Sequence, residues 1–396
     1  NNLIKIVTGI RRSGKSFLLF NLFHNHLTET GISEDHIIEI ALDDRLNKNL
    51  RDPDVILRHI HERIVDDKLY YIILDEVQMI DEFTDVLNSL LHIRNADVYV
   101  TGSNSKFLSK DVVTEFRGRG DEIHLFPLSF AELYNSIGGD KFELWKSYYT
   151  YGGLPGILEL DSEKKKAAYL RSLHETVYLK DIIERNNLKN SEEFMELMRV
   201  MASCIGSPCN PSKLENTFKS VKNETLDRKT ISKYLSYMED AFLIEKSMRY
   251  DIKGRKYIGT LSKYYFQDIG LRNALLNFRQ VEENHIMENV IYNELRLRGF
   301  CVDVGMVEAR TAKERKQLEV DFVANMADRR YYIQSAFAMP DDAKREQECA
   351  SLKRIDDSFK KIIIMRDDIK PYHDNNGFYI VGLMDFLLKP DLMEQL

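Results

Sequence analysis

Residues 9–16 read Gly9-Ile10-Arg11-Arg12-Ser13-Gly14-Lys15-Ser16 and satisfy every fixed position of the phosphate-binding pattern G-x-x-x-x-G-K-S/T. A short β-rich run, residues 3–8, precedes them, and an apolar run able to continue as a helix, residues 17–23, follows them. Strand, glycine loop and helix therefore come in the order that such a site requires, and a chance glycine turn is the weaker alternative. The sequence predicts an α/β fold with a nucleotide bound at the start of the first helix.

The residue types of this loop suit phosphate. Gly9 and Gly14 let the backbone curl so that its N–H groups point at phosphate oxygens, beside the positive end of the following helix. Lys15 is expected to be an exposed loop residue that reaches the β and γ phosphates of ATP, and the Ser16 hydroxyl to bind Mg²⁺. The predicted nucleotide contacts in this region are Gly9, Arg11, Arg12, Ser13, Gly14, Lys15, Ser16 and Phe17.

A pair of acids downstream completes the predicted site. Residues 70–76 read as a buried strand that ends in Asp75 and Glu76. Acids at the carboxyl end of a strand lie at the ligand edge of a parallel sheet. We expect Asp75 to hold Mg²⁺, usually through water, and Glu76 to polarise the attacking water as the catalytic base. An acidic turn after a buried strand is the alternative.

Length and composition limit what this site belongs to. The chain has 396 residues, 43% hydrophobic and 30% charged, which predicts about two to four globular domains. The net charge of -7 argues against a uniformly basic nucleic-acid coat. Four cysteines without a C-x-x-C pair predict reduced thiols in a cytoplasmic protein. No apolar run reaches the length of a membrane span, and no signal peptide opens the chain.

The segment after the acids carries two further candidate positions. Residues 97–101 predict a fourth strand, after which Ser103 or Asn104 is placed to sense the γ-phosphate, and an arginine-containing loop precedes a fifth strand, residues 122–126. This order of parts resembles the AAA-type ATPases, which present an arginine finger from this loop to a neighbouring subunit. The resemblance implies that Arg119, or else Arg117, is a catalytic finger in a homo-oligomer. Solvated arginines in a glycine-rich loop are the alternative.

Helical segments follow the predicted core, residues 1–135. Residues 136–190 are expected to form a helical lid, or a plain set of helices, around the turn Gly152-Gly153-Leu154-Pro155. Residues 191–266 show helix-turn-helix spacing and then a hairpin around Gly254, which together suggest a winged helix. Between residues 211 and 264 there are twelve Lys or Arg against seven Asp or Glu. DNA contact and a protein–protein or interdomain role are both open.

Residues 267–396 alternate helix and strand again. Their layout resembles the restriction-endonuclease-like nucleases, in which a helix Glu, a strand Asp and an E-x-K or Q-x-K pair bind Mg²⁺ and activate water. The resemblance places Glu288, Asp321 and Gln334 at the first three positions, but Ala336 stands where the lysine belongs. Without that ammonium the attacking hydroxide and the phosphate lose stabilisation. We therefore expect a degenerate endonuclease-like domain that does not cut nucleic acid.

The whole chain resembles bacterial and archaeal ATPases that join an AAA-type P-loop domain to a winged helix and a C-terminal endonuclease-like domain. The resemblance implies Mg²⁺-dependent ATP binding and hydrolysis, with the nucleotide state controlling the C-terminal half. The expected ligands and partners are ATP and Mg²⁺, DNA through the winged helix, an unidentified protein and a second copy of this chain, with no membrane. A nucleotide-gated binding switch that turns over slowly, or an ATP-regulated nuclease, are the alternatives.

Overall fold

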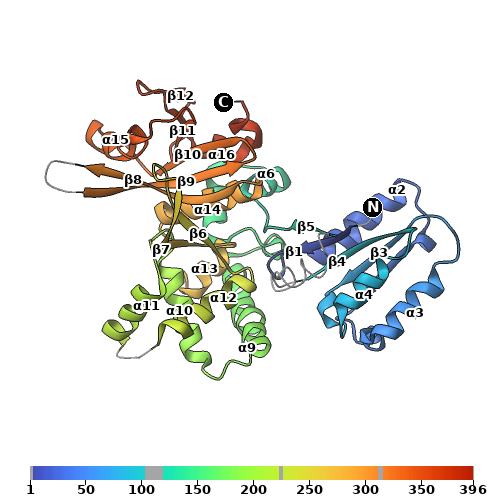
Figure 1. Ribbon diagram of the computed structural model, residues 1–396. Coiled ribbons are helices and arrows are strands. Elements are labelled where there is room, and N and C mark those ends of the chain that lie inside the picture. Colours follow the sequence, from blue (N-terminus) through green and yellow to red (C-terminus); the bar gives the residue numbers. More distant parts are fainter. Residues whose placement is uncertain (1–2, 103–118, 223–225, 311–314, 396) are drawn as a thin grey trace. The chain divides into compact units, whose positions relative to one another are not determined.

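The computed structural model describes residues 3–102, 119–222, 226–310 and 315–395 (Figure 1). The chain divides into two compact units. Unit 1 comprises residues 1–127 with 240–242, and unit 2 comprises residues 128–239 with 243–396.

Unit 1 is built on a five-stranded sheet in the order β2-β3-β4-β1-β5. All four pairings are parallel, as the sequence predicts for this fold. Because parallel strands end at the same edge, the loop after β1 and the acids at the end of β3 lie at one edge of the sheet. The strands are β1 (Ile4–Thr8), β2 (Ile37–Ala41), β3 (Tyr70–Asp75), β4 (Ala96–Thr101) and β5 (Gly120–His124).

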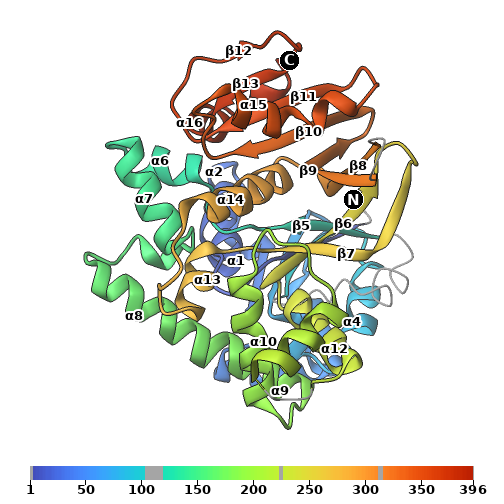
Figure 2. The same ribbon diagram turned by 90° about the vertical axis from the view of Figure 1, so that its left-hand side faces the viewer.

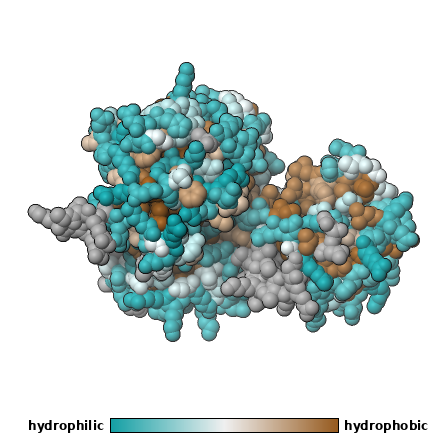
Figure 3. Space-filling view, turned by 45° about the horizontal axis from the view of Figure 1, so that its top comes forward, coloured by the Kyte–Doolittle hydropathy of each residue, from teal (hydrophilic) through white to brown (hydrophobic). Residues whose placement is uncertain are grey.

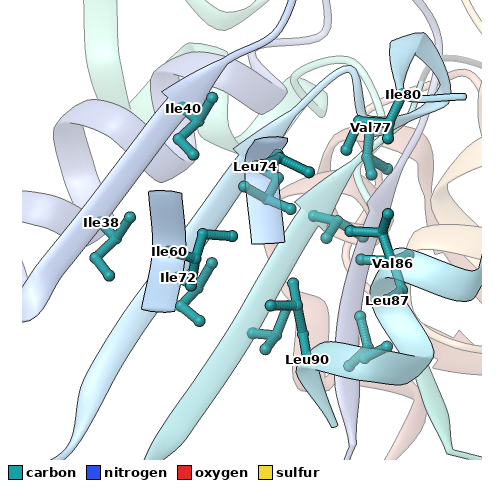
Figure 4. Packing of buried hydrophobic residues seen from close by; sticks show 14 of the residues in the cluster. Ile38, Ile40, Ile60, Ile72, Leu74, Val77, Ile80, Val86, Leu87 and Leu90 are labelled. Carbon is teal, nitrogen blue, oxygen red and sulfur yellow. The ribbon is translucent and has the colours of Figure 1, made fainter. Parts of the chain in front are cut away.

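Helices cover both faces of this sheet. The chain is helical from the end of the glycine loop through α1 (Lys15–Phe17), the π-helical segment η1 (Leu18–Phe23) and α2 (His24–Glu29). Two more helices, α3 (Pro53–Arg63) and α4 (Phe83–Leu90), follow β2 and β3. Alternate residues of β3 divide between two cores, since Ile72 and Leu74 pack with α3 and α4 whereas Ile73 packs with the α1–α2 segment (Figure 4).

Unit 2 contains an eight-stranded mixed sheet in the order β12-β13-β11-β10-β9-β8-β6-β7 (Figure 2). Its strands are β6 (Ile244–Asp251), β7 (Lys256–Phe266), β8 (Cys301–Arg310), β9 (Arg315–Met326), β10 (Arg329–Ala336), β11 (Lys360–Met365), β12 (Tyr372–His373) and β13 (Tyr379–Gly382). The antiparallel hairpin β6–β7, predicted as a wing, joins this sheet because β6 pairs in parallel with β8. The boundary that the sequence analysis places at residue 266 therefore falls between two parts of one sheet.

The helices of unit 2 include those predicted as lid and helix-turn-helix. No helix in the described ranges is long and apolar enough to cross a membrane. The α-helices are α6 (Phe130–Ile137), α7 (Lys141–Tyr151), α8 (Glu163–Leu173), α9 (Lys180–Asn186), α10 (Ser191–Ser203), α11 (Pro211–Thr217), α12 (Arg228–Asp240), α13 (Ile269–Leu275), α14 (Glu283–Leu297), α15 (Asp342–Cys349) and α16 (Leu383–Leu388).

The Gly152-Gly153 turn forms a buried joint with the start of α13. The Asp268 carboxylate caps α13 by accepting from the Leu271 N–H at 2.8 Å, and it also accepts from the Gly153 N–H at 2.9 Å. Gly152 has a φ of +77°, and a Cβ there would lie 2.4 Å from the Asp268 carboxylate. A Cβ on Gly153 would lie 2.1 Å from the Leu128 carbonyl oxygen. The two glycines are therefore required by close packing inside unit 2.

Gly153→Ala should destabilise unit 2 strongly. The added methyl meets backbone rather than a flexible side chain, so overpacking should cost about 2–3 kcal/mol. We expect the melting temperature to fall by roughly 5–10 °C in a calorimetric scan. Gly259→Ala is the matched control, because a Cβ at that glycine meets nothing within 4 Å. Equal melting temperatures for the two variants would contradict the claim that close packing at the Gly152-Gly153 turn requires glycine.

Candidate functional site

The backbone of the glycine loop adopts the curled conformation that phosphate binding needs. Gly9 and Gly14 have φ values of +137° and +100°, and Arg12 has a φ of +67°. A Cβ on Gly9 would lie 2.2 Å from the Leu125 carbonyl oxygen, so only glycine fits there. The helix starts at once, with the Leu18 N–H donating to the Gly14 carbonyl at 2.8 Å. The loop therefore leads directly into a helix N-terminus, which favours an anion.

Lys15 is buried, contrary to the expectation of an exposed loop lysine. Only 6% of the residue is exposed, and its ammonium donates to the carbonyls of Gly9 at 2.9 Å and Ile10 at 3.1 Å. Burial lowers the pKa of Lys15 to about 8, although the charges of Glu76 and Asp75 act in the opposite direction. The ammonium is thus held between the loop and the acid pair, where an added phosphate would strengthen its charged form.

Thr101 at the end of β4 orients both acids, and the sequence analysis did not select it. The Thr101 hydroxyl donates to Asp75, and its oxygen accepts from the Glu76 N–H at 2.9 Å. Asp75 is buried, and Glu76 has a left-handed backbone with φ +53° and accepts from the side-chain amide of Gln78. The register of β3 against β4, Leu74 opposite Val100, brings the next residues Asp75 and Thr101 together. A strand-end hydroxyl beside a strand-end acid is the signal that could have found it.

The other predicted nucleotide contacts differ in exposure. Ser13 is buried, and its hydroxyl has no hydrogen-bond partner within the described part of the chain. Ser16, Arg12 and Phe17 are exposed, and Phe17 is 59% exposed. An unpartnered hydroxyl under a curled glycine loop, next to a buried lysine and two acids, fits a polyphosphate with Mg²⁺. Ser16 and Asp75 would hold the metal.

The remaining predicted positions of this site lie in or beside the loop before β5. Arg119 is exposed, and its carbonyl accepts from the Ile4 N–H at 2.9 Å, which places its backbone at the start of β1, the end of the strand away from the glycine loop. Ser103, Asn104 and Arg117 lie outside the described residues.

A second cluster of charged side chains lies in unit 2, where the sequence analysis expected a degenerate metal site. Glu288 of α14 and Asp321 of β9 are brought together there, with Glu319 as a third carboxylate that was not predicted. The ammonium of Lys263, on β7, lies 2.7 Å from Glu288 Oε1, 2.8 Å from Glu319 Oε1 and 3.8 Å from Asp321 Oδ1. A strand distant in sequence therefore supplies a cation that faces these acids, although Ala336 stands where the resemblance places a lysine.

Gln334 and Ala336 lie on β10, beside this cluster. The N–H of Ser335, between them, donates to Asp321 Oδ2 at 2.8 Å, and Gln334 Oε1 is buried without a hydrogen-bond partner among the described residues. Lys344 and Arg345, on the helix α15 that follows β10, have partners elsewhere. Lys344 pairs with Glu348 at 2.6 Å, and Arg345 donates to the Tyr372 hydroxyl at 3.0 Å.

The fold and site of unit 1 define a P-loop domain of the AAA type. Residues 1–134 match the family model described as an AAA domain, and residues 142–282 match one described as a domain of unknown function. The loop and the acid pair both lie inside the first match.

Relatives of the whole chain are known. A Haemophilus influenzae protein described as uncharacterized is 32% identical over 397 residues, covering 98% of this chain and 95% of the relative. The chain therefore belongs to the family of that protein. An uncharacterized protein of Methanocaldococcus jannaschii is 29% identical over 374 residues, covering 90% and 79%. Among solved structures, the Aeropyrum pernix ORC2 protein aligns at 13% identity over 73% of this chain and 89% of its own, but its TM-score of 0.40 supports no argument.

Proposed function

We propose that this protein is an Mg²⁺-dependent ATPase whose nucleotide state controls the second half of the chain. The observation that carries the proposal is the meeting of the glycine loop, the buried Lys15 and the Asp75–Glu76 pair at one edge of a parallel sheet. Bound Mg²⁺ would neutralise charge on the phosphates. In this proposal Ser16 and Asp75 hold the metal, Lys15 binds the terminal phosphates, and Glu76 accepts a proton from water.

Steady-state hydrolysis of ATP tests this proposal. We expect phosphate release that requires Mg²⁺ and changes when duplex DNA is added, because the α12 surface and the hairpin turn carry exposed cations. Arg228, Lys229 and Lys233 are exposed on α12, and Lys253, Arg255 and Lys256 lie at the β6–β7 turn. These residues support a winged-helix contact with phosphates. DNA that leaves both hydrolysis and binding unchanged would favour a protein partner for this surface.

A slow nucleotide-gated switch is the second candidate, and one observation favours it. The Glu76 carboxylate accepts a hydrogen bond from the Gln78 amide, and the Glu76 backbone is in the left-handed region. The carboxylate is therefore held before any water is bound. A base restrained in this way would hydrolyse ATP slowly while ATP binding stays tight. Multiple turnovers per minute would rule the switch out, and single-turnover decay over hours would rule it in.

Turnover per chain should rise with protein concentration if Arg119 is a finger. Arg119 is exposed beside the start of β1, so it is available to the nucleotide site of a second copy of the chain. Figure 3 shows hydrophobic surface on unit 1. Phe17 and Leu22 of the same unit are exposed apolar residues, which supports such association. We expect Arg119→Ala to remove the concentration dependence and to lower turnover by 10³-fold or more, an order of magnitude typical of arginine fingers.

The concentration series is measured across the range where light scattering shows the change from monomer to oligomer. Arg94→Ala controls for the loss of an arginine from unit 1. Flat activity per chain across that range would make Arg119 a surface arginine.

A further inference from the structure

The carboxylate cluster of unit 2, defined as Glu288, Glu319 and Asp321, surrounds an ammonium where the endonuclease-like resemblance implies Mg²⁺. We propose that Lys263 is a built-in cation that takes the place of a divalent metal in this cluster. Unit 2 then works as a metal-independent module that does not cut nucleic acid. The inference concerns unit 2 alone and does not depend on the function proposed for the nucleotide site.

The geometry around Lys263 is that of a filled cation site. An ammonium has three N–H donors and no acceptor. The ammonium donates to Glu288 Oε1 at 2.7 Å, and it forms ion pairs with Glu319 Oε1 at 2.8 Å and Asp321 Oδ1 at 3.8 Å. The three carboxylates come from α14 and β9, and the lysine comes from β7, so the fold itself brings cation and anions together (Figures 1 and 2).

Two further donors reach these acids. Glu288 Oε1 accepts a second hydrogen bond, from the Tyr265 hydroxyl at 2.7 Å, and Asp321 Oδ2 accepts from the Ser335 N–H at 2.8 Å. Within the described ranges, no group of three or more His, Cys, Asp or Glu is arranged to hold a metal ion. Mg²⁺ would need near-octahedral oxygens at about 2.0–2.1 Å. The metal therefore does not fit while the lysine is in place.

Burial explains why the lysine stays in place. Its side chain is only 3% exposed, and burial alone would lower its pKa. The charges of Glu288, Asp321 and Glu319 outweigh burial and raise the pKa of Lys263 well above its ordinary value. Withdrawal of the ammonium would leave the lysine without a partner and the acids facing one another. Such a loss of one partner from a buried ion cluster is destabilising because buried charge is left uncompensated.

The test counts Mn²⁺ ions bound to the nucleotide-free full chain, from the electron paramagnetic resonance signal of free Mn²⁺. Lys263→Met should bind one more ion per chain than the parent, with affinity at least tenfold tighter than any site of the parent. The double variant Lys263→Met, Asp321→Asn should lose that ion. Lys253→Met is the matched control, since it removes a lysine that is 51% exposed at the turn of the same hairpin, and should gain none.

Three results would overturn the proposal. One is Mn²⁺ binding by the parent that Asp321→Asn removes, and another is a folded Lys263→Met chain that gains no ion. The third is cleavage of supercoiled or single-stranded DNA by the parent, with Mg²⁺ or Mn²⁺, that disappears in Asp321→Ala. If Lys263→Met does not fold without metal, its folding is measured by circular dichroism as Mn²⁺ is added. Recovery of the fold by Mn²⁺ supports the proposal, and failure to recover at saturating Mn²⁺ contradicts it.

Discussion

Lys15→Ala should weaken ATP binding by roughly tenfold to a hundredfold while unit 1 remains folded. In this phosphate-binding pattern the lysine ammonium reaches the terminal phosphates, so Lys15 supplies a positive charge to them. A charge-assisted hydrogen bond to phosphate contributes about 1.5–3 kcal/mol, and the upper value alone corresponds to roughly a hundredfold in affinity. Titration calorimetry in the presence of Mg²⁺ measures the change.

The burial of Lys15 makes folding a necessary control for this variant. Alanine leaves the carbonyls of Gly9 and Ile10 without their ammonium donor, but both belong to a loop beside the ligand edge, where water can replace it. Lys48→Ala removes an exposed lysine from the same unit and should leave ATP affinity unchanged. An unaltered dissociation constant in a folded Lys15→Ala chain would overturn the assignment of the site.

Local patterns predicted the core of unit 1 well. The expected strands at residues 3–8 and 70–76 correspond to β1 (Ile4–Thr8) and β3 (Tyr70–Asp75), because a glycine loop and a pair of strand-end acids each fix their own immediate surroundings. The apolar spacing of α14 (Glu283–Leu297) is a local pattern of the same kind.

Long-range pairings explain what the sequence did not show. Lys263 lies in a run of strand residues, Lys263-Tyr264-Tyr265-Phe266. A lysine in such a run needs an acidic partner if it is buried, but sequence spacing does not show which acids Lys263 contacts. That depends on how β7, α14 and β9 converge in unit 2. The neighbours of the Gly152-Gly153 turn leave a lid angle and a plain helix–helix turn both open, whereas Asp268, more than a hundred residues later, gives the turn a packing role.

Glu76→Gln should keep ATP binding within about threefold and lower the rate of hydrolysis by roughly 10²–10⁴-fold, the usual contribution of a positioned general base. The amide has the shape of the carboxylate, and its oxygen can still accept a hydrogen bond from Gln78. The hydrogen bond from the residue 76 N–H to the Thr101 hydroxyl does not involve the changed side chain. It cannot take a proton from water at neutral pH. Binding and turnover should therefore separate in this variant, whereas they fall together in Lys15→Ala.

Single-turnover decay of bound ATP measures the rate, and calorimetry measures the affinity of the same preparation. Glu82→Gln is the matched control, because Glu82 is an exposed glutamate of unit 1 with a similar left-handed backbone, φ +50°, and lies outside the site. Its turnover should equal that of the parent. Hydrolysis by Glu76→Gln at the parental rate would exclude Glu76 as the base, and an equally slow parent would instead identify the protein as a nucleotide-gated switch whose base is already restrained by Gln78.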